Sequence, residues 1–472
     1  MWRNIVRAGA SKLPRFVQRF GTCFARPESR SHALTYVSGL LQATGRKSIE
    51  PIALRFTPRP SEEAVGAKEV LAMQRFVTDS PWDAQAVQRQ IQATAAEELF
   101  PSAAASPLGV VGVIDESSFE KNGTHSVGVK RQYCGHLGKT DNCQVGVFLV
   151  GTVPAGEALL DHQLYLPKEW TKDRRRRKKA RVPKQVRFQT KPQIAAELIR
   201  RTVANGHVQF DWIVADDHYG ENGGFLDALE SARQRYMVET PITTTFWMVD
   251  PATQVPPDCG HGRPRTQPSR DQVCSARNII AALPAHAWQP IKLREGAKGP
   301  LVFEYARLRV WAVRHRGPGP AVWLVLQRSV DDPREVKVWV SNADEQTPLE
   351  LLAQAGATRF RVELFFEEAK GELGMAHYEA RAWTSWHHHM ALVAMAHLFA
   401  TLVRQDCQAD KTHLTLRQSF DLIRAALNRP PQTYDESLRL TEYYLTRNAT
   451  ATRSHRKTWL QKHKRLAEQL ML

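Results

Sequence analysis

Cysteine is scarce in this chain, with six residues in 472, and no two of them have the CxxC spacing of a metal or redox pair. Cysteine and histidine do not follow zinc-finger intervals either. A chain this long with so few cysteines lacks the density of a disulfide-stapled secreted domain. We therefore exclude a disulfide framework and expect a reducing, cytoplasmic compartment.

Long hydrophobic runs are absent as well. A membrane-spanning helix needs roughly 18 or more consecutive apolar residues. The best run, residues 390–403, is shorter and contains His397. We interpret this run as a buried core helix and expect no membrane partner.

Acidic residues are outnumbered, because 48 Asp and Glu stand against 65 Lys and Arg and leave a net charge of +17. Such an excess is typical of proteins that bind polyanions, since basic side chains displace the counterions condensed on phosphates. A polymerase or a small-molecule hydrolase leaves this charge unexplained. The densest basic run either follows a DNA backbone or forms a solvated loop. It consists of Arg174, Arg175, Arg176, Arg177, Lys178 and Lys179.

The chain divides into helical and strand-rich stretches. Up to residue 105, apolar residues recur at three- and four-residue intervals, which predicts helices. After Pro107, short valine-rich runs broken by glycines predict strands, and further alternating runs lie at 305–343. We predict five segments: a helical DNA-binding domain at 1–105, the first part of a catalytic core at 106–242, a β-rich insertion at 243–349, a catalytic helix region completing the core at 350–410, and a basic helical tail at 411–472.

Three acidic residues, far apart in the chain, have the positions that a nuclease site needs. Asp115 in GVVGVIDESSF and Asp216 in DWIVADDHYG each end a short apolar run that predicts a buried strand. Glu363 in RFRVELFFEEAKGEL lies in a helical stretch. These side chains supply the hard oxygen ligands that Mg²⁺ prefers. Two such ions activate the attacking oxygen and stabilise the leaving oxygen in phosphodiester cleavage.

Neighbouring carboxylates leave two of these choices open. Asp217 follows Asp216 directly, and strand alternation directs only one of the two inward. Glu367 shares the helical face of Glu363. A strand-end aspartate is also common as a plain turn or cap residue. We set two further aspartates aside as loop residues, Asp141 and Asp161.

Cations share the helical face of Glu363. Arg359 lies one turn before it and Lys370 nearly two turns after it. A carboxylate flanked by two cations suits a site that holds a phosphate backbone. The alternative is an ordinary salt-bridged helix surface.

A cluster of three histidines, His387, His388 and His389, follows two tryptophans. Three successive histidines on a helix cannot all face one ion. We therefore expect a surface or DNA-contact role for them rather than a metal site. Elsewhere in the chain, we expect Trp212 and Trp247 in the core.

Long ordered blocks surround the three acidic residues. They are QRFVTDSPWDAQAV, VIDESSFEKNGTHSVGVKRQYCGHLGKTDNCQVGVFL with Asp115, LYLPKEWTKD, VRFQTKP, VADDHYG with Asp216, and RFRVELFFEEAKGELGMAHYEARAWTSWHHHMAL with Glu363. In this order they resemble the bacterial insertion-sequence transposases of the DDE type, in particular the IS701 group of the IS4-like superfamily. The resemblance covers most of the chain.

The resemblance implies an α/β fold with a ribonuclease-H-like mixed-sheet catalytic core, a β-rich insertion and a helical N-terminal domain. It implies that Asp115, Asp216 and Glu363 are catalytic and hold two Mg²⁺ ions, for which Mn²⁺ can substitute. Arg359 and Lys370 match the arginine and lysine of the IS4-type signature, and we expect both to contact DNA. The tyrosine of that signature corresponds to Gly356 here, which puts a role for the tyrosine in doubt.

The implied activity is that of a DNA transposase, which cleaves DNA at the element ends and transfers the strand by direct transesterification. The implied partners are double-stranded DNA, as terminal inverted repeats and as target, and a second copy of the chain in a homodimer. The implied location is the bacterial cytoplasm, with the nucleoid. Two alternatives stay open: a catalytically silent or repurposed DNA-binding protein, and a stand-alone nuclease on the same core.

Overall fold

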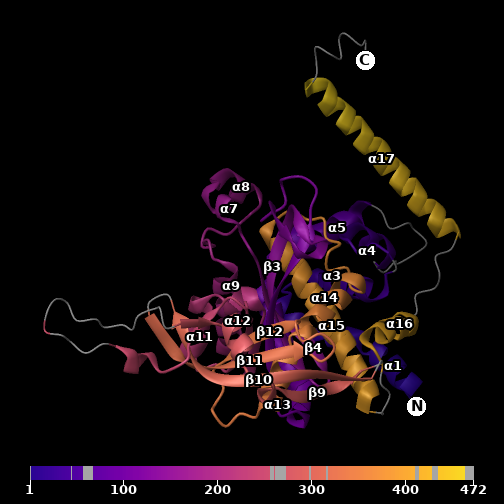
Figure 1. Ribbon diagram of the computed structural model, residues 1–472. Coiled ribbons are helices and arrows are strands. Elements are labelled where there is room, and N and C mark those ends of the chain that lie inside the picture. Colours follow the sequence, from indigo (N-terminus) through magenta and orange to yellow (C-terminus); the bar gives the residue numbers. More distant parts are fainter. Residues whose placement is uncertain are drawn as a thin grey trace.

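The computed structural model describes residues 2–43, 45–56, 67–255, 260, 273–296, 299–314, 317–409, 414–427 and 434–462. The last ten residues of the predicted basic tail, 463–472, lie outside these ranges. Figure 1 shows a central sheet with helices packed around it and one long helix, α17, standing away from the body.

The first hundred residues are helical, as predicted. They form α1 (Trp2–Ser11), α2 (Leu13–Gln18), α3 (Pro27–Gln42), α4 (Ile49–Phe56), α5 (Ala67–Thr78) and α6 (Ala84–Glu98). Helix α6 begins after Asp83, whose side chain accepts the backbone N–H of Gln85 at 2.9 Å. Buried aromatic side chains such as Phe20 and Tyr36 join these helices to the main core.

Five strands after the helices form one half of the sheet. They are β1 (Val111–Glu120), β3 (Lys139–Val153), β4 (Gly156–Leu164), β5 (Trp212–Ala215) and β6 (Tyr236–Thr240). A sixth strand, β2 (Lys130–Cys134), also pairs with β3. Strand β3 pairs antiparallel with β1 and β4, whereas β1, β5 and β6 pair parallel. Helices α9 (Lys191–Ala204), α10 (Asp217–Gly220) and α11 (Gly223–Ser231) make the crossovers. This is the predicted ribonuclease-H-like order.

The predicted β-rich insertion is present and continues the same sheet. Its elements are β7 (Thr245–Trp247), β8 (Val273–Ser275), α12 (Ala276–Ala282), β9 (Gln289–Gly296), β10 (Gly299–Arg314), β11 (Gly317–Ser329) and β12 (Val336–Ser341). Strand β12 pairs antiparallel with β6, with Val338 opposite Thr240. The insertion therefore covers the edge of the catalytic strands, and its β10 and β11 cross the lower part of Figure 1.

The chain after the insertion is helical. It forms α13 (Leu349–Ala357), α14 (Phe360–Gly371), α15 (Trp383–Ala409), α16 (Leu416–Ala426) and α17 (Tyr434–Lys462). The helical region predicted at 350–410 is interrupted after α14, where Gly374 takes a left-handed φ of +67°. The apolar run at 390–403 is buried within α15, as predicted. Within the described residues, no helix is long and apolar enough to cross a membrane.

The remaining elements are short. Helices α7 (Lys168–Lys172) and α8 (Arg174–Lys179) lie between β4 and α9. Single turns of 3-10 helix occur at Gly21–Cys23, Phe100–Ala105, Gly135–Leu137, Pro251–Gln254 and Ala285–Ala287. The basic run at 174–179 is thus a helix and not a loop.

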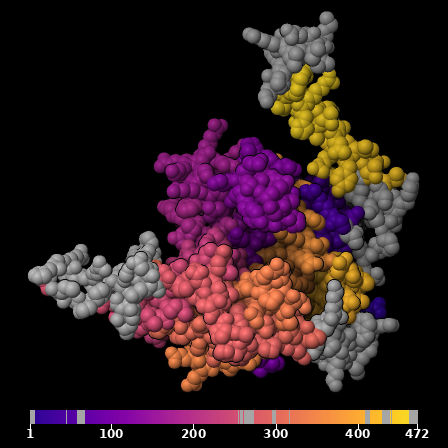
Figure 2. Space-filling model, viewed as in Figure 1, coloured from indigo at the N-terminus to yellow at the C-terminus, as the bar shows by residue number. Residues whose placement is uncertain are grey.

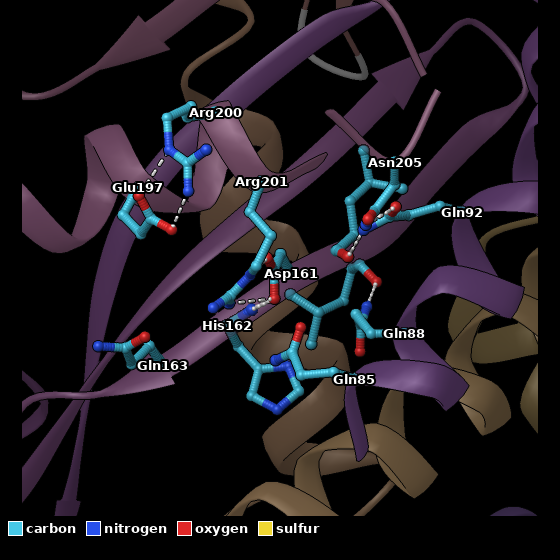
Figure 3. A network of polar contacts seen from close by, with 12 residues as sticks. Gln85, Gln88, Gln92, Asp161, His162, Gln163, Glu197, Arg200, Arg201 and Asn205 are labelled. Carbon is cyan, nitrogen blue, oxygen red and sulfur yellow. Dashed lines mark hydrogen bonds and ion pairs between the residues drawn. The ribbon is translucent and has the colours of Figure 1, made fainter. Parts of the chain in front are cut away.

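A buried polar network joins α6 to the sheet, and it shows that Asp161 is not a loop residue (Figure 3). Asp161 lies on β4, is fully buried and receives two hydrogen bonds from Arg201, at 2.7 and 2.8 Å. Beside this pair, Gln92 of α6 donates to the carbonyl of Leu160 at 2.9 Å. Asp141 also lies on a strand, β3. Both expectations of loop positions were wrong, because these carboxylates sit inside regular strands.

The histidine cluster does not have the expected surface role. His388 and His389 are 1% and 0% exposed, because α15 is the central core helix. The two ring nitrogens of His388 lie 2.9 and 2.8 Å from the carbonyls of Val77 and Trp82, and its ring stacks on the Trp82 indole. The cluster fastens the N-terminal helices to α15. Trp212 and Trp247 are buried, as predicted.

Candidate active site

The register of three parallel strands brings acidic residues into one row. Ile114 on β1 pairs with Ala215 on β5, and Ala215 pairs with Val238 on β6. The next residue on each strand is acidic, namely Asp115, Asp216 and Glu239. Side chains in register on neighbouring strands point to the same face. Three carboxylates thus lie side by side where β5 and β6 end.

Asp115 is largely buried beside other charges. Its side chain is 14% exposed, and burial together with the charge of Asp216 raises its pKa to about 7. The backbone N–H of Glu116 donates to Asp115 Oδ1 at 2.6 Å, and Arg359 lies 3.5 Å from Oδ2. Both contacts favour the ionised form. The raised pKa shows that they do not fully offset burial, so the carboxylate would gain from a further cation.

Asp216, rather than Asp217, faces the interior. Burial, followed by the charges of Glu116 and Asp217, raises the pKa of Asp216 to about 6. Its Oδ1 is buried and has no hydrogen-bond partner in the described part of the chain. Asp217, in the first turn of α10, is exposed. Buried polar atoms are normally satisfied, so an orphaned carboxylate oxygen marks a place for a ligand.

Arg359 connects α14 to the row of carboxylates. It is the residue before the first turn of α14 and is only 19% exposed. Its guanidinium lies 3.5 Å from Asp115 and 3.8 Å from Glu239, and it also forms an ion pair with Glu363. The charges of these carboxylates raise the pKa of Arg359 against its burial. Arg359 thus bridges residues from three distant parts of the chain.

The other acidic and basic residues of α14 point in different directions. Glu363 is 45% exposed beside Arg359, and Glu367 is exposed on the next turn. Glu368 faces the core and lies 3.4 Å from His397. Lys370 donates to the carbonyl of Ser118 on β1 at 3.2 Å, and burial lowers its pKa. Lys370 therefore fixes α14 against β1 instead of standing free in solvent.

No group of three or more His, Cys, Asp or Glu is arranged to hold a metal ion within the ranges that the structure describes. The ion pairs suggest the reason, because Arg359 engages Glu363 and also contacts Asp115. The donors nevertheless suit a hard cation, since Asp115 and Asp216 lie adjacent and one buried oxygen of Asp216 is unpartnered. The residues present therefore fit a divalent metal.

A cleft of about 750 Å³ opens beside Arg359 and Glu363, between α14 and the insertion strands. Gly356, at the position of the signature tyrosine, lines this cleft and packs on the indole of Trp339. A Cβ on Gly356 would lie 3.4 Å from that ring. That separation is an ordinary van der Waals contact, so Gly356 lies against Trp339 of β12 at the wall of the cleft.

Glu239 is the residue that the sequence analysis missed. It lies on β6, is 18% exposed, and forms ion pairs with Arg359 at 3.8 Å and with Lys337 at 3.3 Å. Its position beside Asp216 depends on the register of β6 against β5, which local sequence does not reveal. An acidic residue at the end of the strand following Asp216 is the signal that points to it.

The basic run lies outside this site. Helix α8 stands beyond the far end of β1, where β1, β3 and β2 continue past the short strands β5 and β6. Figure 1 places α7 and α8 in the upper part of the main body, away from the insertion strands β9, β10 and β11. Any contact that this run makes with DNA is therefore separate from the carboxylates.

A five-stranded mixed sheet of this order, with aspartates on neighbouring central strands, is the arrangement of the ribonuclease-H-like class. A comparison with family models agrees and is more specific. The chain belongs to the DDE superfamily endonucleases, whose model matches residues 19–300. The match includes Asp115, Asp216 and Glu239 and ends before Glu363.

Two similar proteins are transposases. The probable transposase for insertion sequence element IS701 of Microchaete diplosiphon is 30% identical over 215 residues, which is 45% of this chain and 50% of that protein. The chain thus matches about half the length of this relative. A piggyBac transposase in a synaptic complex with hairpin DNA is a more remote likeness, with a TM-score of 0.37 and 8% identity over 87% of this chain and 76% of that one.

Proposed function

We propose that this protein is a DNA transposase that cleaves the ends of an insertion sequence and joins the freed strand to a new site. The adjacent aspartates Asp115 and Asp216, linked through Arg359 to Glu363, are the observation that supports this best. Membership of the DDE superfamily endonucleases and similarity to a probable insertion-sequence transposase support the same function.

We assign Asp115, Asp216 and Glu363 as the catalytic, metal-holding residues, with Mg²⁺ as the ion, two ions in all, and Mn²⁺ as a substitute. Bound divalent metal supplies activation of the attacking oxygen and stabilisation of the leaving oxygen. Asp115 and Asp216 would hold the metal as carboxylates, because only the deprotonated groups are ligands. Glu363 would complete the set if its side chain turned from Arg359 toward the two aspartates.

With Glu363 turned away, Arg359 would be free to pair with another anion. Its guanidinium already lies near Asp115 and Glu239, so it is placed to pair with a phosphate at the reacting position. Lys370, through its bond to Ser118, keeps α14 in register with β1. We therefore propose that Arg359 contacts DNA and that Lys370 holds α14 in place.

Double-stranded DNA is the proposed partner, as terminal inverted repeats and as target. A homodimer is proposed because two element ends are handled together. The N-terminal helices are proposed to bind the repeats. The excess of basic residues supports a polyanionic partner.

The test is cleavage of a labelled duplex that carries the flanking element end, with Mg²⁺, by wild type and by Asp115→Ala and Glu363→Gln. We expect metal-dependent cuts at the element boundary in wild type and none in either variant, with DNA binding retained. Glu367→Gln is the matched control, because it removes an exposed carboxylate one turn along the same helix and should cleave normally.

Three results would redirect the assignment. Tight binding of wild type without any cut would favour a catalytically silent DNA-binding protein. Cuts that ignore the element boundary would favour a stand-alone nuclease. Full activity of Glu363→Gln with loss in Glu367→Gln would move the third ligand to Glu367.

A further inference from the structure

The segment 168–191 holds twelve basic and two acidic residues, so it carries +10 of the chain's net +17. It contains α7, α8 and the chain leading to α9. Some of its cations have partners, such as Lys191 with Glu116 and Arg181 with Asp79. The run on α8 is different, because its six cations divide into two sets.

Two arginines hold α8 in place. Arg176 donates to the carbonyl of Thr124 at 2.7 Å and lies 3.7 Å over the ring of Trp170, which is buried. Arg177 donates to the carbonyls of Pro183 and Val186, each at 2.9 Å. Both are partly buried. The guanidinium groups of Arg176 and Arg177 are therefore engaged by other parts of the protein.

The other four cations face solvent. Arg174, Arg175, Lys178 and Lys179 are exposed, and their side chains form none of the ion pairs or hydrogen bonds found among the described residues. At 100° per residue they span roughly 140° of the helix, and Arg176 and Arg177 occupy the opposite side. We name these four residues the α8 basic face. A short helix clamped by two arginines presents them together.

The α8 basic face lies beyond the end of β1 that extends past the carboxylates. Strand β1 runs on from Asp115 to Glu120, which is paired to Cys143 of β3, and Cys143 is paired to Lys130 of β2. Five residues of strand cover about 17 Å. Lys130 then forms an ion pair with Glu169 of α7 at 2.6 Å, and Trp170 donates to the carbonyl of Val129 at 2.9 Å. The strands β1, β3 and β2 thus extend from the carboxylates toward α7 and α8.

We propose that the α8 basic face binds the phosphate backbone of duplex DNA several base pairs from the point of cleavage, and that Arg176 and Arg177 do not touch DNA. The inference rests on the proposed function for the identity of the polyanion. A distance of about 17 Å or more along β1, β3 and β2 corresponds to half a turn of duplex or more, since one turn spans roughly 34 Å. In Figure 2 the segment 168–191 lies in the upper part of the view, in the purple-to-magenta range of the bar.

The test is the salt dependence of duplex binding, measured by fluorescence anisotropy without divalent metal, so that no cleavage intervenes. Each phosphate contact contributes about 0.9 to the slope of log K against log salt. Lys178→Ala/Lys179→Ala should lower the slope by about 2, and the variant without all four side chains by up to about 4. Thermal unfolding of these surface variants should match wild type.

The matched control removes two exposed cations at the opposite edge of the parallel strands, Arg200→Ala/Arg233→Gly. Among the described residues, Arg200 pairs with the partly exposed Glu197 of its own helix, and glycine suits the φ of +54° at Arg233. The net charge changes equally, so an equal loss of slope in both double variants would overturn the proposal. An unchanged slope for Lys178→Ala/Lys179→Ala would overturn it as well.

A second variant separates anchoring from charge. Arg176→Lys keeps the charge but cannot reproduce the planar guanidinium contact with Trp170 and Thr124. We expect weaker DNA binding for it, whereas Arg174→Lys/Arg175→Lys should bind like wild type. Vesicles rich in phosphatidylserine serve as another polyanion. If Lys178→Ala/Lys179→Ala lost vesicle binding and kept DNA binding, a membrane surface would replace DNA and the proposal would fail.

The proposal for the α8 basic face and the catalytic assignment can be rejected independently. Normal cleavage at the element boundary, with salt slopes unchanged in the α8 variants, would reject only the proposed role of the α8 basic face. The expected slope changes in the α8 variants, without any cleavage by wild type, would reject only the proposed catalysis.

Discussion

At the scale of single residues, the most informative property is the raised pKa of Asp115, about 7, beside that of Asp216, about 6. Burial is the first cause in both cases. A folded-state pKa above the ordinary value of 3.8 means that the folded protein binds the proton more tightly than the unfolded chain. Stability of the metal-free protein therefore falls as the pH rises from about 4 to about 7.

Asp115→Asn should remove most of this pH dependence. At pH 8 the variant should be more stable than metal-free wild type by about 2–4 kcal/mol, because three pKa units correspond to about 4 kcal/mol. At pH 4 the two should be nearly equal. Urea unfolding with EDTA at both pH values measures this, and a stability difference that does not vary with pH would contradict it.

Glu239 allows a second prediction at this scale. Glu239→Gln removes one of the carboxylates that surround Arg359, so the guanidinium should turn further toward Asp115 and compete with metal. We expect affinity for Mn²⁺, measured by electron paramagnetic resonance without DNA, to fall on the order of 10-fold. The control is Glu345→Gln, which changes an exposed loop residue. This variant should bind Mn²⁺ as wild type does.

Sequence reasoning located Asp115, Asp216 and the helix of Glu363 because apolar runs and helical spacing mark strands and helices locally. It left Asp216 and Asp217 undecided, and burial of one and exposure of the other now favour Asp216. It missed Glu239 because register between strands depends on pairing between distant segments. It misjudged His388 because polar side chains can be buried where backbone carbonyls accept their hydrogens.

At the scale of elements, the join between β4 and α9 depends on a buried ion pair. Asp161 is 0% exposed and receives two hydrogen bonds from Arg201 (Figure 3). Asp161→Ala would leave the Arg201 charge without its partner, which typically costs about 3–5 kcal/mol. Urea unfolding should show this loss.

The same helix offers the control. Glu197 pairs with Arg200 on the surface of α9. Glu197→Ala should change stability by less than about 1 kcal/mol, because exposed ion pairs contribute little. An equal effect of both changes would mean that burial of Asp161 does not decide its contribution.

At the scale of the whole molecule, one sheet unites the catalytic strands and the insertion. The β-rich character of the insertion was predictable from alternating residues, but its union with the catalytic sheet was not, because that union is a single long-range pairing of β12 with β6. Replacing residues 243–335 by a short linker that also prevents this pairing should expose the β6 edge. Exposed edges favour aggregation.

Size-exclusion chromatography measures this prediction as loss of the soluble monomer or dimer peak. Truncation after Arg447 is the matched control. It removes the part of α17 beyond the ion pair with Glu50, and Figure 1 shows α17 pointing away from the body. That variant should elute normally, and normal elution of both would show that β6 tolerates an open edge.

The pairing of β12 with β6 also determines how long the edge of β6 stays uncovered during synthesis. Thr240 and Val338, which face each other in the sheet, are 98 residues apart in the chain. A ribosome adding about 5–20 residues per second leaves the edge of β6 uncovered for about 5–20 s. During that interval the strand next to Asp216 is open to any other nascent chain on the same message. Translation speed across the insertion, and chaperones that reach the chain in those seconds, should therefore govern how much active protein each transcript yields.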